Sequence, residues 1–296
     1  MNLYSWYVFK TLVREKSFVR TAKQLNISQS AVSHIIADLE KACGCSLFIR
    51  NRNNAELTGG GRQLLPYVRQ LLNCNDSLLR NVEDLKQAKR GEVRIAAFHS
   101  ASAVWLPDII SRCKEKYPDI RIFLRQTGDG KISSMIENYE VDLALITQDA
   151  VNKDVQFLPL HATPLQWITA EDYVPVNGCS ITLEDLKKNA LIFPQEGYDT
   201  EMALYLQRSG IPCEPLYRIE DDTTIFEYVE RGYGISLMPL MTATCCGGRI
   251  RTWDLEIPMM RVVGLVNVYG EMISPVAEAL RQEIIDYMKD QQLINV

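Results

Sequence analysis

The sequence predicts a multidomain α/β protein with an N-terminal winged helix-turn-helix, a long linker helix and a two-lobed α/β domain. Two short helical patterns and a β-type pair follow one another in residues 17–58, and an apolar stripe at helical spacing occupies residues 59–90. From residue 91 onward, apolar strands alternate with helical segments. With 296 residues and 47% hydrophobic residues, the chain can hold two or three domains.

Charge is distributed unevenly along the chain. Residues 1–90 contain 14 Lys and Arg against 7 Asp and Glu, whereas the remainder contains 18 against 30. A basic N-terminal part followed by an acidic remainder is typical of a phosphate-binding module joined to a soluble sensor domain. Chance clustering of solvated charge is the alternative.

A helix-turn-helix is predicted near the N-terminus. Residues 3–15 form a first helix, and residues 21–25 form a helical turn that an Asn-Ile pair interrupts. Ser28 is well placed as the N-cap of the next helix, which we expect to run through Glu40.

The helix after Ser28 has one apolar and one polar face. Val32, Ile36 and Leu39 recur at i, i+4 and i+7 and should face the core. Short polar side chains then point outward from the first two turns, where a recognition helix reaches base edges and favours phosphate. The residues of this helix expected to contact DNA are Ser28, Gln29, Ser30, Ser33 and His34.

Two β-type runs after this helix predict a wing. Residues 47–50 and 55–58 are joined by an Asn-rich segment that suits a hairpin turn. Arg50, Arg52 and Asn53 would then lie against phosphate or in the minor groove. The alternative is an αα-hairpin followed by a hairpin with a solvated basic turn.

The same stretch resembles the N-terminal signature of LysR-type transcriptional regulators. The resemblance implies sequence-specific binding to double-stranded DNA and a winged helix-turn-helix fold. The matching residues are Ser17, Phe18, Ala22, Leu25, Ser28, Gln29, Ala31, Val32, Ser33, Ile36, Leu39, Glu40, Gly44, Leu47, Phe48, Arg50, Leu57 and Thr58.

Three positions depart from that family pattern. Ser30 stands where the family usually has Pro, Ile35 where it usually has a polar residue, and Ala37 where Arg is common. Ile35 would be partly exposed on the groove side, where it could pack on a thymine methyl group. Such a contact would shift operator preference without changing how the helix docks.

A long helix capped by Thr58 should follow the wing. Its apolar residues alternate at spacings of four and three, with Asn75 in the missing place, and this is the spacing of a coiled-coil seam. We expect two copies to pair antiparallel along this seam, and resemblance to the family's linker helix supports a homodimer and favours a homotetramer. The alternative is that the helix packs on its own chain. The seam residues are Leu64, Val68, Leu71, Asn75, Leu78 and Val82, beside a second row of Leu65, Leu72 and Leu79.

The domain after the linker helix resembles the periplasmic-binding-protein-like effector domain of LysR regulators. A charged hinge at residues 87–92 precedes it, and its alternating elements include an expected helix at residues 103–117 and an expected strand at residues 165–169. The predicted boundaries are 1–58 for the winged domain, 59–90 for the linker helix and 91–296 for the effector domain. Within the last, lobe I covers about 91–161 and 268–296, and lobe II covers about 162–267.

Small polar residues follow the expected strands of both lobes, where a cleft would bind a small-molecule effector. Serine hydroxyls and helix amides could receive a small anion or a carboxylate, although an aromatic ligand is an open alternative. Each residue alone could instead be a helix cap or turn residue. The expected effector contacts are Ser100, Ser102, Thr127, Thr147, Pro194 and Gln195.

Other classes of function have little support in the sequence. No hydrolase, zinc-protease, P-loop or dinucleotide motif occurs, so neither an enzyme nor a cofactor is expected, and eight cysteines without a C-x-x-C pair suggest no metal site. The sequence shows no signal peptide or membrane-spanning run, which favours a cytoplasmic regulator over a solute-binding protein. A thiol-based redox regulator of the same fold is the alternative, through Cys179 with Cys213 or Cys245 with Cys246.

Overall fold

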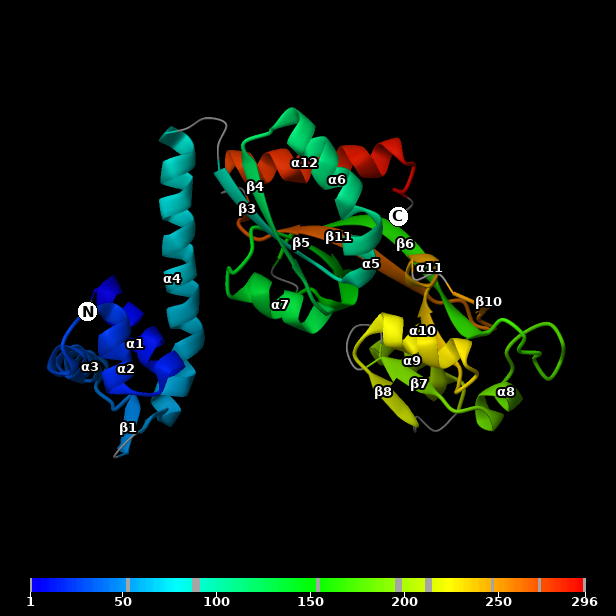
Figure 1. The fold of residues 1–296 in the computed structure, drawn as a ribbon, viewed down its shortest axis with the longest axis horizontal. Coiled ribbons are helices and arrows are strands. Elements are labelled where there is room, and N and C mark those ends of the chain that lie inside the picture. The colour runs from blue at the N-terminus through cyan, green and yellow to red at the C-terminus, as the bar shows by residue number, and fades with distance from the viewer. Residues whose placement is uncertain are drawn as a thin grey trace. The chain divides into compact units, whose positions relative to one another are not determined.

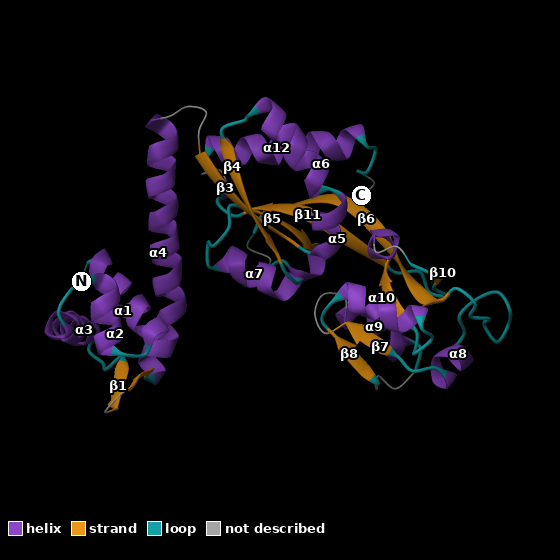
Figure 2. Ribbon diagram, in the orientation of Figure 1, coloured by secondary structure: helices purple, strands orange, loops and turns teal. Residues whose placement is uncertain are grey.

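The computed structural model has two compact units of mixed helix and strand (Figures 1 and 2). Contacts group Met1–Glu83 with Glu137–Glu140, and group Asp84–Ile136 with Val141–Val296. None of the helices in the described part of the chain is both long and apolar enough to cross a membrane. The structure describes residues 2–51, 54–86, 91–152, 155–194, 199–210, 215–245, 248–270 and 273–294.

Three capped helices open the chain: α1 (Leu3–Glu15), α2 (Phe18–Leu25) and α3 (Gln29–Cys43). The Ser28 hydroxyl accepts a hydrogen bond from the Ala31 amide at 3.1 Å, which confirms the predicted N-cap. The predicted end of α3 at Glu40 was three residues short, because the left-handed residue that stops the helix is Gly44.

The wing is a two-stranded antiparallel hairpin of β1 (Phe48–Asn51) and β2 (Asn54–Leu57). Its register pairs Phe48 with Leu57 at the base, and the Ala55 amide donates to the Lys16 carbonyl at 2.9 Å. The predicted hairpin is therefore confirmed. Its inner side chains join the core of the three helices, which contains Val8, Phe9, Leu12, Ala22, Val32, Ile36, Leu39, Leu47, Phe48 and Ala55.

The long helix α4 (Gly59–Lys86) starts at the predicted cap, where the Thr58 hydroxyl accepts from the Gly61 amide at 3.0 Å. Its first turns pack on the winged domain, and Val68 is only 4% exposed in that core. Leu64 and Val68, which the predicted dimer seam includes, pack on the core of their own domain, since a stripe this wide covers the α4 side of that core; the seam itself stays a prediction.

The later turns of α4 keep an exposed apolar side. Leu71, Leu78 and Val82 are 46%, 60% and 39% exposed, and Asn75 is half-buried. Leu79, from the second predicted row, is exposed as well.

The second unit contains a seven-stranded mixed sheet in the order β10-β6-β11-β5-β3-β4, with β9 also paired to β6. Strands β3, β4 and β5 are parallel, as alternating strands and helices require. Helices α6 and α12 lie side by side on one side of this sheet, and α7 lies on the other (Figure 1). The strands are β3 (Gly91–Ala97), β4 (Ile120–Gln126), β5 (Leu143–Thr147), β6 (Phe157–Ala170), β9 (Ser236–Pro239), β10 (Ile250–Asp254) and β11 (Met260–Asn267).

Helices and a short parallel pair of strands complete the two lobes. Lobe I has its core between the sheet and α5, α6, α7 and α12, whereas lobe II has two smaller cores. The remaining elements are α5 (His99–Val104), α6 (Leu106–Lys116), α7 (Asp129–Glu137), η1 (Gln148–Ala150), α8 (Leu183–Lys188), β7 (Ile192–Pro194), α9 (Asp199–Arg208), β8 (Tyr217–Ile219), α10 (Asp222–Glu230), α11 (Leu240–Cys245) and α12 (Pro275–Asp290).

Some predicted elements of this unit differ from the structure. The single helix expected at residues 103–117 is two helices, α5 and α6, because Pro107 occupies the first turn of a new helix. Strand β6 has 14 residues rather than the five expected, since pairing with β11 carries it past two prolines. Strand β11, which the expected boundary put in lobe II, pairs with β5 and packs in the lobe I core.

A buried carboxylate organises the start of α8 in lobe II. Asp185 is fully buried; burial raises the pKa of its carboxyl, but hydrogen bonds from Thr182, Tyr173 and the Val176 amide outweigh this effect and lower the pKa to about 2. Burial and the hydrogen bond to Asp185 raise the pKa of Tyr173 to about 12. The network ties the segment before α8 to the helix.

Candidate functional site

The first two turns of α3 present polar side chains to solvent. Ser28, Gln29, Ser30 and His34 are exposed and Ser33 is half-buried, while Val32, Ile36 and Leu39 on the opposite side are buried. The Gln29 amide nitrogen donates to the Ser33 hydroxyl at 3.1 Å, and the hydroxyls of Ser28 and Ser30 are 2.9 Å apart. The helix therefore brings together all five of its predicted DNA contacts. We call these five residues the α3 polar face.

An acidic residue borders this face. His34 Nδ1 lies 3.3 Å from the Asp38 carboxylate, and both side chains are largely exposed. The sequence analysis missed Asp38, although its i, i+4 spacing from His34 on the solvent side was visible. A carboxylate here opposes close approach of phosphate and limits how far along α3 a duplex can contact the helix.

Glu40 holds α3 against the wing. Its carboxylate Oε1 accepts hydrogen bonds from the Leu47 amide at 2.7 Å and the Phe48 amide at 3.1 Å. Both amides belong to the start of the wing, whose side chains are buried. Because one carboxylate receives both donors, the direction of α3 is coupled to that of β1.

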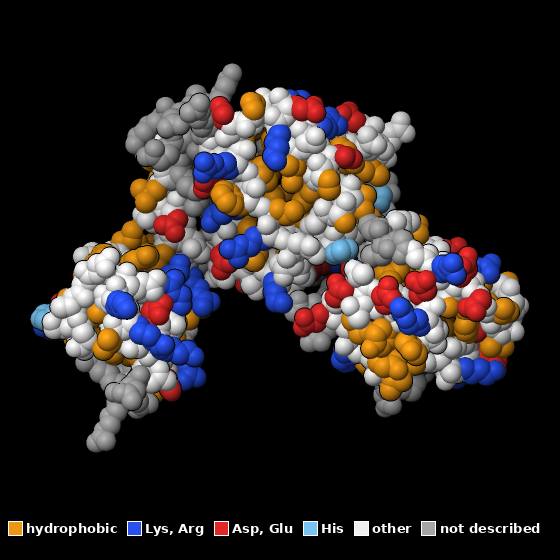
Figure 3. Space-filling model, in the orientation of Figure 1, with side chains coloured by type: hydrophobic (Ala, Val, Ile, Leu, Met, Phe, Trp, Pro, Cys, Tyr) orange, Lys and Arg blue, Asp and Glu red, His pale blue; other side chains and the backbone are white. Residues whose placement is uncertain are grey.

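Arg52 and Asn53 lie outside the described residues, as does the side chain of Arg50. The strands on either side of them are paired as far as Asn51 and Asn54. Blue Lys and Arg side chains outnumber red ones on the visible side of this domain (Figure 3).

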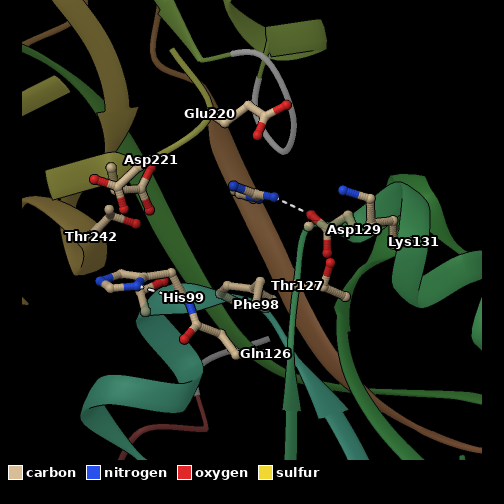
Figure 4. Close-up of a pocket in the computed structure, with 13 residues that line it drawn as sticks. Phe98, His99, Gln126, Thr127, Asp129, Lys131, Glu220, Asp221 and Thr242 are labelled. Atoms are coloured by element: carbon tan, nitrogen blue, oxygen red, sulfur yellow. Dashed lines mark hydrogen bonds and ion pairs between the residues drawn. The ribbon is translucent and has the colours of Figure 1, made fainter. Parts of the chain in front are cut away.

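A second candidate site is a pocket between the two lobes of the other unit. It is a cavity of about 290 Å³, and Figure 4 shows Glu220 and Asp221 across it from Asp129 and Lys131. Helices α5 and α7 of lobe I and the start of α10 of lobe II supply most of its walls. We call it the interlobe pocket; its lining residues are Phe98, His99, Ser100, Gln126, Thr127, Gly128, Asp129, Lys131, Glu220, Asp221, Asp222, Thr242 and Arg261.

A buried ionic cluster joins the lobes beneath this pocket. Arg261 on β11 pairs with Asp129 at the start of α7, and its Nε lies 3.5 Å from the Glu201 carboxylate of α9. The Thr147 hydroxyl also donates to Asp129, at 3.0 Å. Burial raises the pKa of Glu201, and the nearby Arg261 charge opposes that rise. Any change in the distance between the lobes must alter these contacts.

Only two of the six predicted effector residues line the interlobe pocket: Ser100 and Thr127. The Ser102 hydroxyl instead donates to the Ala97 carbonyl at 3.4 Å, and Thr147 is buried behind Asp129. Pro194 is buried in β7, and Gln195 lies outside the described residues.

The sequence analysis did not predict that charged residues line the pocket. His99 was noted only as a strand-end histidine; it lines the pocket with Nδ1 3.1 Å from the Gln126 amide nitrogen. Arg261 and Glu220 sit in segments without a motif and come together only through the crossover of β6 and β11. The acidic run from Glu220 to Asp222 was the one visible signal.

Comparison with known proteins decides the family. Residues 3–62 match "Bacterial regulatory helix-turn-helix protein, lysR family", and residues 86–289 match "LysR substrate binding domain". The chain belongs to the LysR family. This LysR-type protein is thus a DNA-binding transcriptional regulator with an effector-binding domain, as its N-terminal residues predicted.

Relatives of this LysR-type regulator match along nearly the whole chain. The HTH-type transcriptional regulator YfeR of Shigella flexneri is 29% identical, covering 94% of this chain and 92% of its own. The RuBisCO operon transcriptional regulator of Allochromatium vinosum is 27% identical and covers 96% of each chain. Full-length CbnR complexed with its target DNA has the same fold, with a TM-score of 0.69 at 16% identity over 97% of this chain and all of CbnR.

Proposed function

We propose that this LysR-type regulator binds an interrupted palindromic operator as a homodimer or as a homotetramer made of two such dimers. The α3 polar face would enter the major groove of each half-site, and the wing tip would lie along phosphate or in the minor groove. The observation that supports this proposal is that the helix with this exposed polar face is also held to the wing, through the hydrogen bonds that Glu40 accepts from the Leu47 and Phe48 amides. The related structure of CbnR with its target DNA supports the same use of the domain.

The exposed side of α4 supplies the dimer contact in this proposal. Leu71, Leu78, Leu79 and Val82 are all at least 39% exposed, and such a stripe on one helix is typical of a surface that a second copy covers. Two-fold pairing explains why the operator should be palindromic, with half-sites about one helical turn or a multiple of it apart.

Effector binding would act through the interlobe pocket, because residues of both lobes line it. A ligand that contacts both walls favours one distance between them, and the Arg261 cluster beneath would transmit the change. On this proposal the domains follow the boundaries 1–58, 59–90 and 91–296. The protein works in the cytoplasm by binding, without catalysis.

The redox alternative has no specific support among the described residues. Cys179 is exposed, but Cys213, Cys246 and the side chain of Cys245 lie outside those residues. Burial raises the pKa of Cys43, with further contributions from Cys45 and Glu40, and this disfavours a reactive thiolate there.

Selection of bound duplexes from a random pool at fixed salt tests the proposal. We expect an interrupted palindrome to be enriched. In Gln29→Ala, a lost base contact should lower the preference for that operator by about 1 to 3 kcal/mol, with little change on random duplex. Gln24→Ala in α2 is a matched control that removes an exposed glutamine side chain outside α3. Equal losses on both duplexes for Gln29→Ala would count against α3 as the reader.

A further inference from the structure

We infer that the interlobe pocket selects a small ligand with a protonated amine at one end and a hydroxyl or carboxylate at the other. The amine would face Glu220, Asp221 and Asp222, and the second group would face Ser100, Thr127 and Lys131. This inference rests on the proposed function, in that the same pocket receives the effector, and it adds the chemical class of that effector.

The first argument is the charge of the lobe II wall. Three consecutive carboxylates at the start of α10 line the pocket, and red side chains gather where lobe II faces lobe I (Figure 3). Asp221 uses Oδ2 to accept from the Thr224 amide at 2.8 Å and the Thr224 hydroxyl at 2.9 Å. Its other oxygen has no hydrogen bond within the described residues, and neither has Glu220.

The positive charges of the pocket do not cancel this wall. Arg261 is already paired with Asp129, which also lines the pocket, so the two largely neutralise each other. Lys131 is the other basic residue among the lining residues, on the lobe I side, where Figure 4 shows it across from Glu220, so two cations line the pocket with four carboxylates. The pocket thus has an acidic end and a basic end, with an excess of negative charge, and this arrangement matches a zwitterion or an amino alcohol.

The second argument comes from the hydroxyls of two largely buried residues. Ser100 and Thr242 are each only 2% exposed and both line the pocket, yet within the described chain neither hydroxyl has a hydrogen-bond partner. Among the described residues neither oxygen is both shut off from the solvent and without a partner, so both hydroxyls open into the pocket, where water or a ligand can complete their hydrogen bonds. Thr242 lies on α11 and Ser100 on α5, so the two hydroxyls reach the pocket from different elements.

Two competing ligand classes fit less well. An anion was the expectation from the sequence, but α5 has only six residues and the facing wall is acidic. A metal ion would need clustered ligands, and the described residues contain no group of three or more His, Cys, Asp or Glu arranged to hold one. An ammonium group instead donates hydrogen bonds, and carboxylates that do not converge on one point can accept them.

Three probes of equal chain length separate these classes: aminopentanol, δ-aminovalerate and glutarate. Binding to the full chain is followed by NMR of the threonine methyl groups, with Thr127 and Thr242 reporting on the pocket and Thr21 serving as a remote control. We expect saturable shifts at Thr127 and Thr242 with one or both amine probes, and at least tenfold weaker binding of glutarate. The better of the two amines identifies the group at the basic end.

Charge removal supplies the second part of the test. Glu220→Gln/Asp221→Asn/Asp222→Asn removes three charges while Asn keeps the helix cap, and it should weaken amine binding about tenfold or more. Glu171→Gln/Asp172→Asn/Glu230→Gln removes three carboxylates of the same lobe that line a separate surface hollow, and it should leave amine binding unchanged.

The outcomes that overturn the inference are specific. They are tighter binding of glutarate than of both amines, shifts produced by Ca²⁺ alone, no saturable shift with either amine, or equal losses in both triple variants. Operator selection is run on the same protein: an enriched palindrome with a failed amine test rejects only the ligand class. No enrichment rejects the proposed function itself.

Discussion

Removing the Glu40 carboxylate should loosen the wing from α3. In Glu40→Ala, the amides of Leu47 and Phe48 lose their shared acceptor, and both residues are at most 5% exposed, so water replaces it poorly. A buried donor left unsatisfied costs about 1 to 3 kcal/mol, so the two together cost at least about 2 kcal/mol. Glu40→Gln keeps a neutral acceptor and should lose about half of this.

Hydrogen exchange followed by mass spectrometry of the full chain measures this loss locally. A cost of about 2 kcal/mol predicts that protection of peptides spanning Leu47 and Phe48 falls about 30-fold in Glu40→Ala. Asp38→Ala is the matched control, because its exposed carboxylate is on the same helix and makes no such clamp. Unchanged protection in Glu40→Ala, or an equal fall in Asp38→Ala, would refute the clamp.

Three further predictions concern α4 and lobe II. Gly61→Ala should destabilise the winged domain, because an added Cβ would overlap the Leu47 carbonyl, whereas Gly59→Ala meets nothing and should be neutral or stabilising in thermal unfolding. Asp185→Asn should cost about 2 kcal/mol at neutral pH, since the folded pKa of about 2 lies below the ordinary value of 3.8. In urea titrations that difference should be full above about pH 4 and vanish as pH falls through about 2; a pH-independent difference would contradict it. Leu78→Glu should turn dimers into monomers in analytical ultracentrifugation with the fold unchanged, because Leu78 is 60% exposed; a persistent dimer would rule out the α4 stripe as the contact.

The elements that local sequence dictates were predicted well. The Ser28 cap, the polar side of α3 and the paired strands of the wing depend on interactions between residues a few positions apart, and such interactions leave a visible spacing. The ends of elements were less accurate, as at Glu40, because a helix ends where a left-handed residue and tertiary contacts allow it.

Helix α4 shows that the spacing of apolar residues does not identify the surface against which they pack. Leu64, Val68, Leu71 and Leu78 share one heptad-like pattern, yet the first two pack on the winged domain and the last two are exposed. A stripe of apolar side chains indicates that each turn of a helix packs against other residues, but it does not indicate whether those residues belong to the same chain or to another.

The sequence alone thus determined the family, the capped helix proposed to read DNA and the α/β class, because these follow from local spacing and helix caps. Tertiary structure alone decided the interior of the interlobe pocket. Asp129 and Arg261 are 132 residues apart in the chain and become partners only because β11 returns the chain from lobe II to the lobe I sheet, where it pairs with β5 and β6. Contacts of that range depend on the closure of the whole chain, so apart from the acidic run from Glu220 to Asp222 the charge of the pocket had no signature in any single segment.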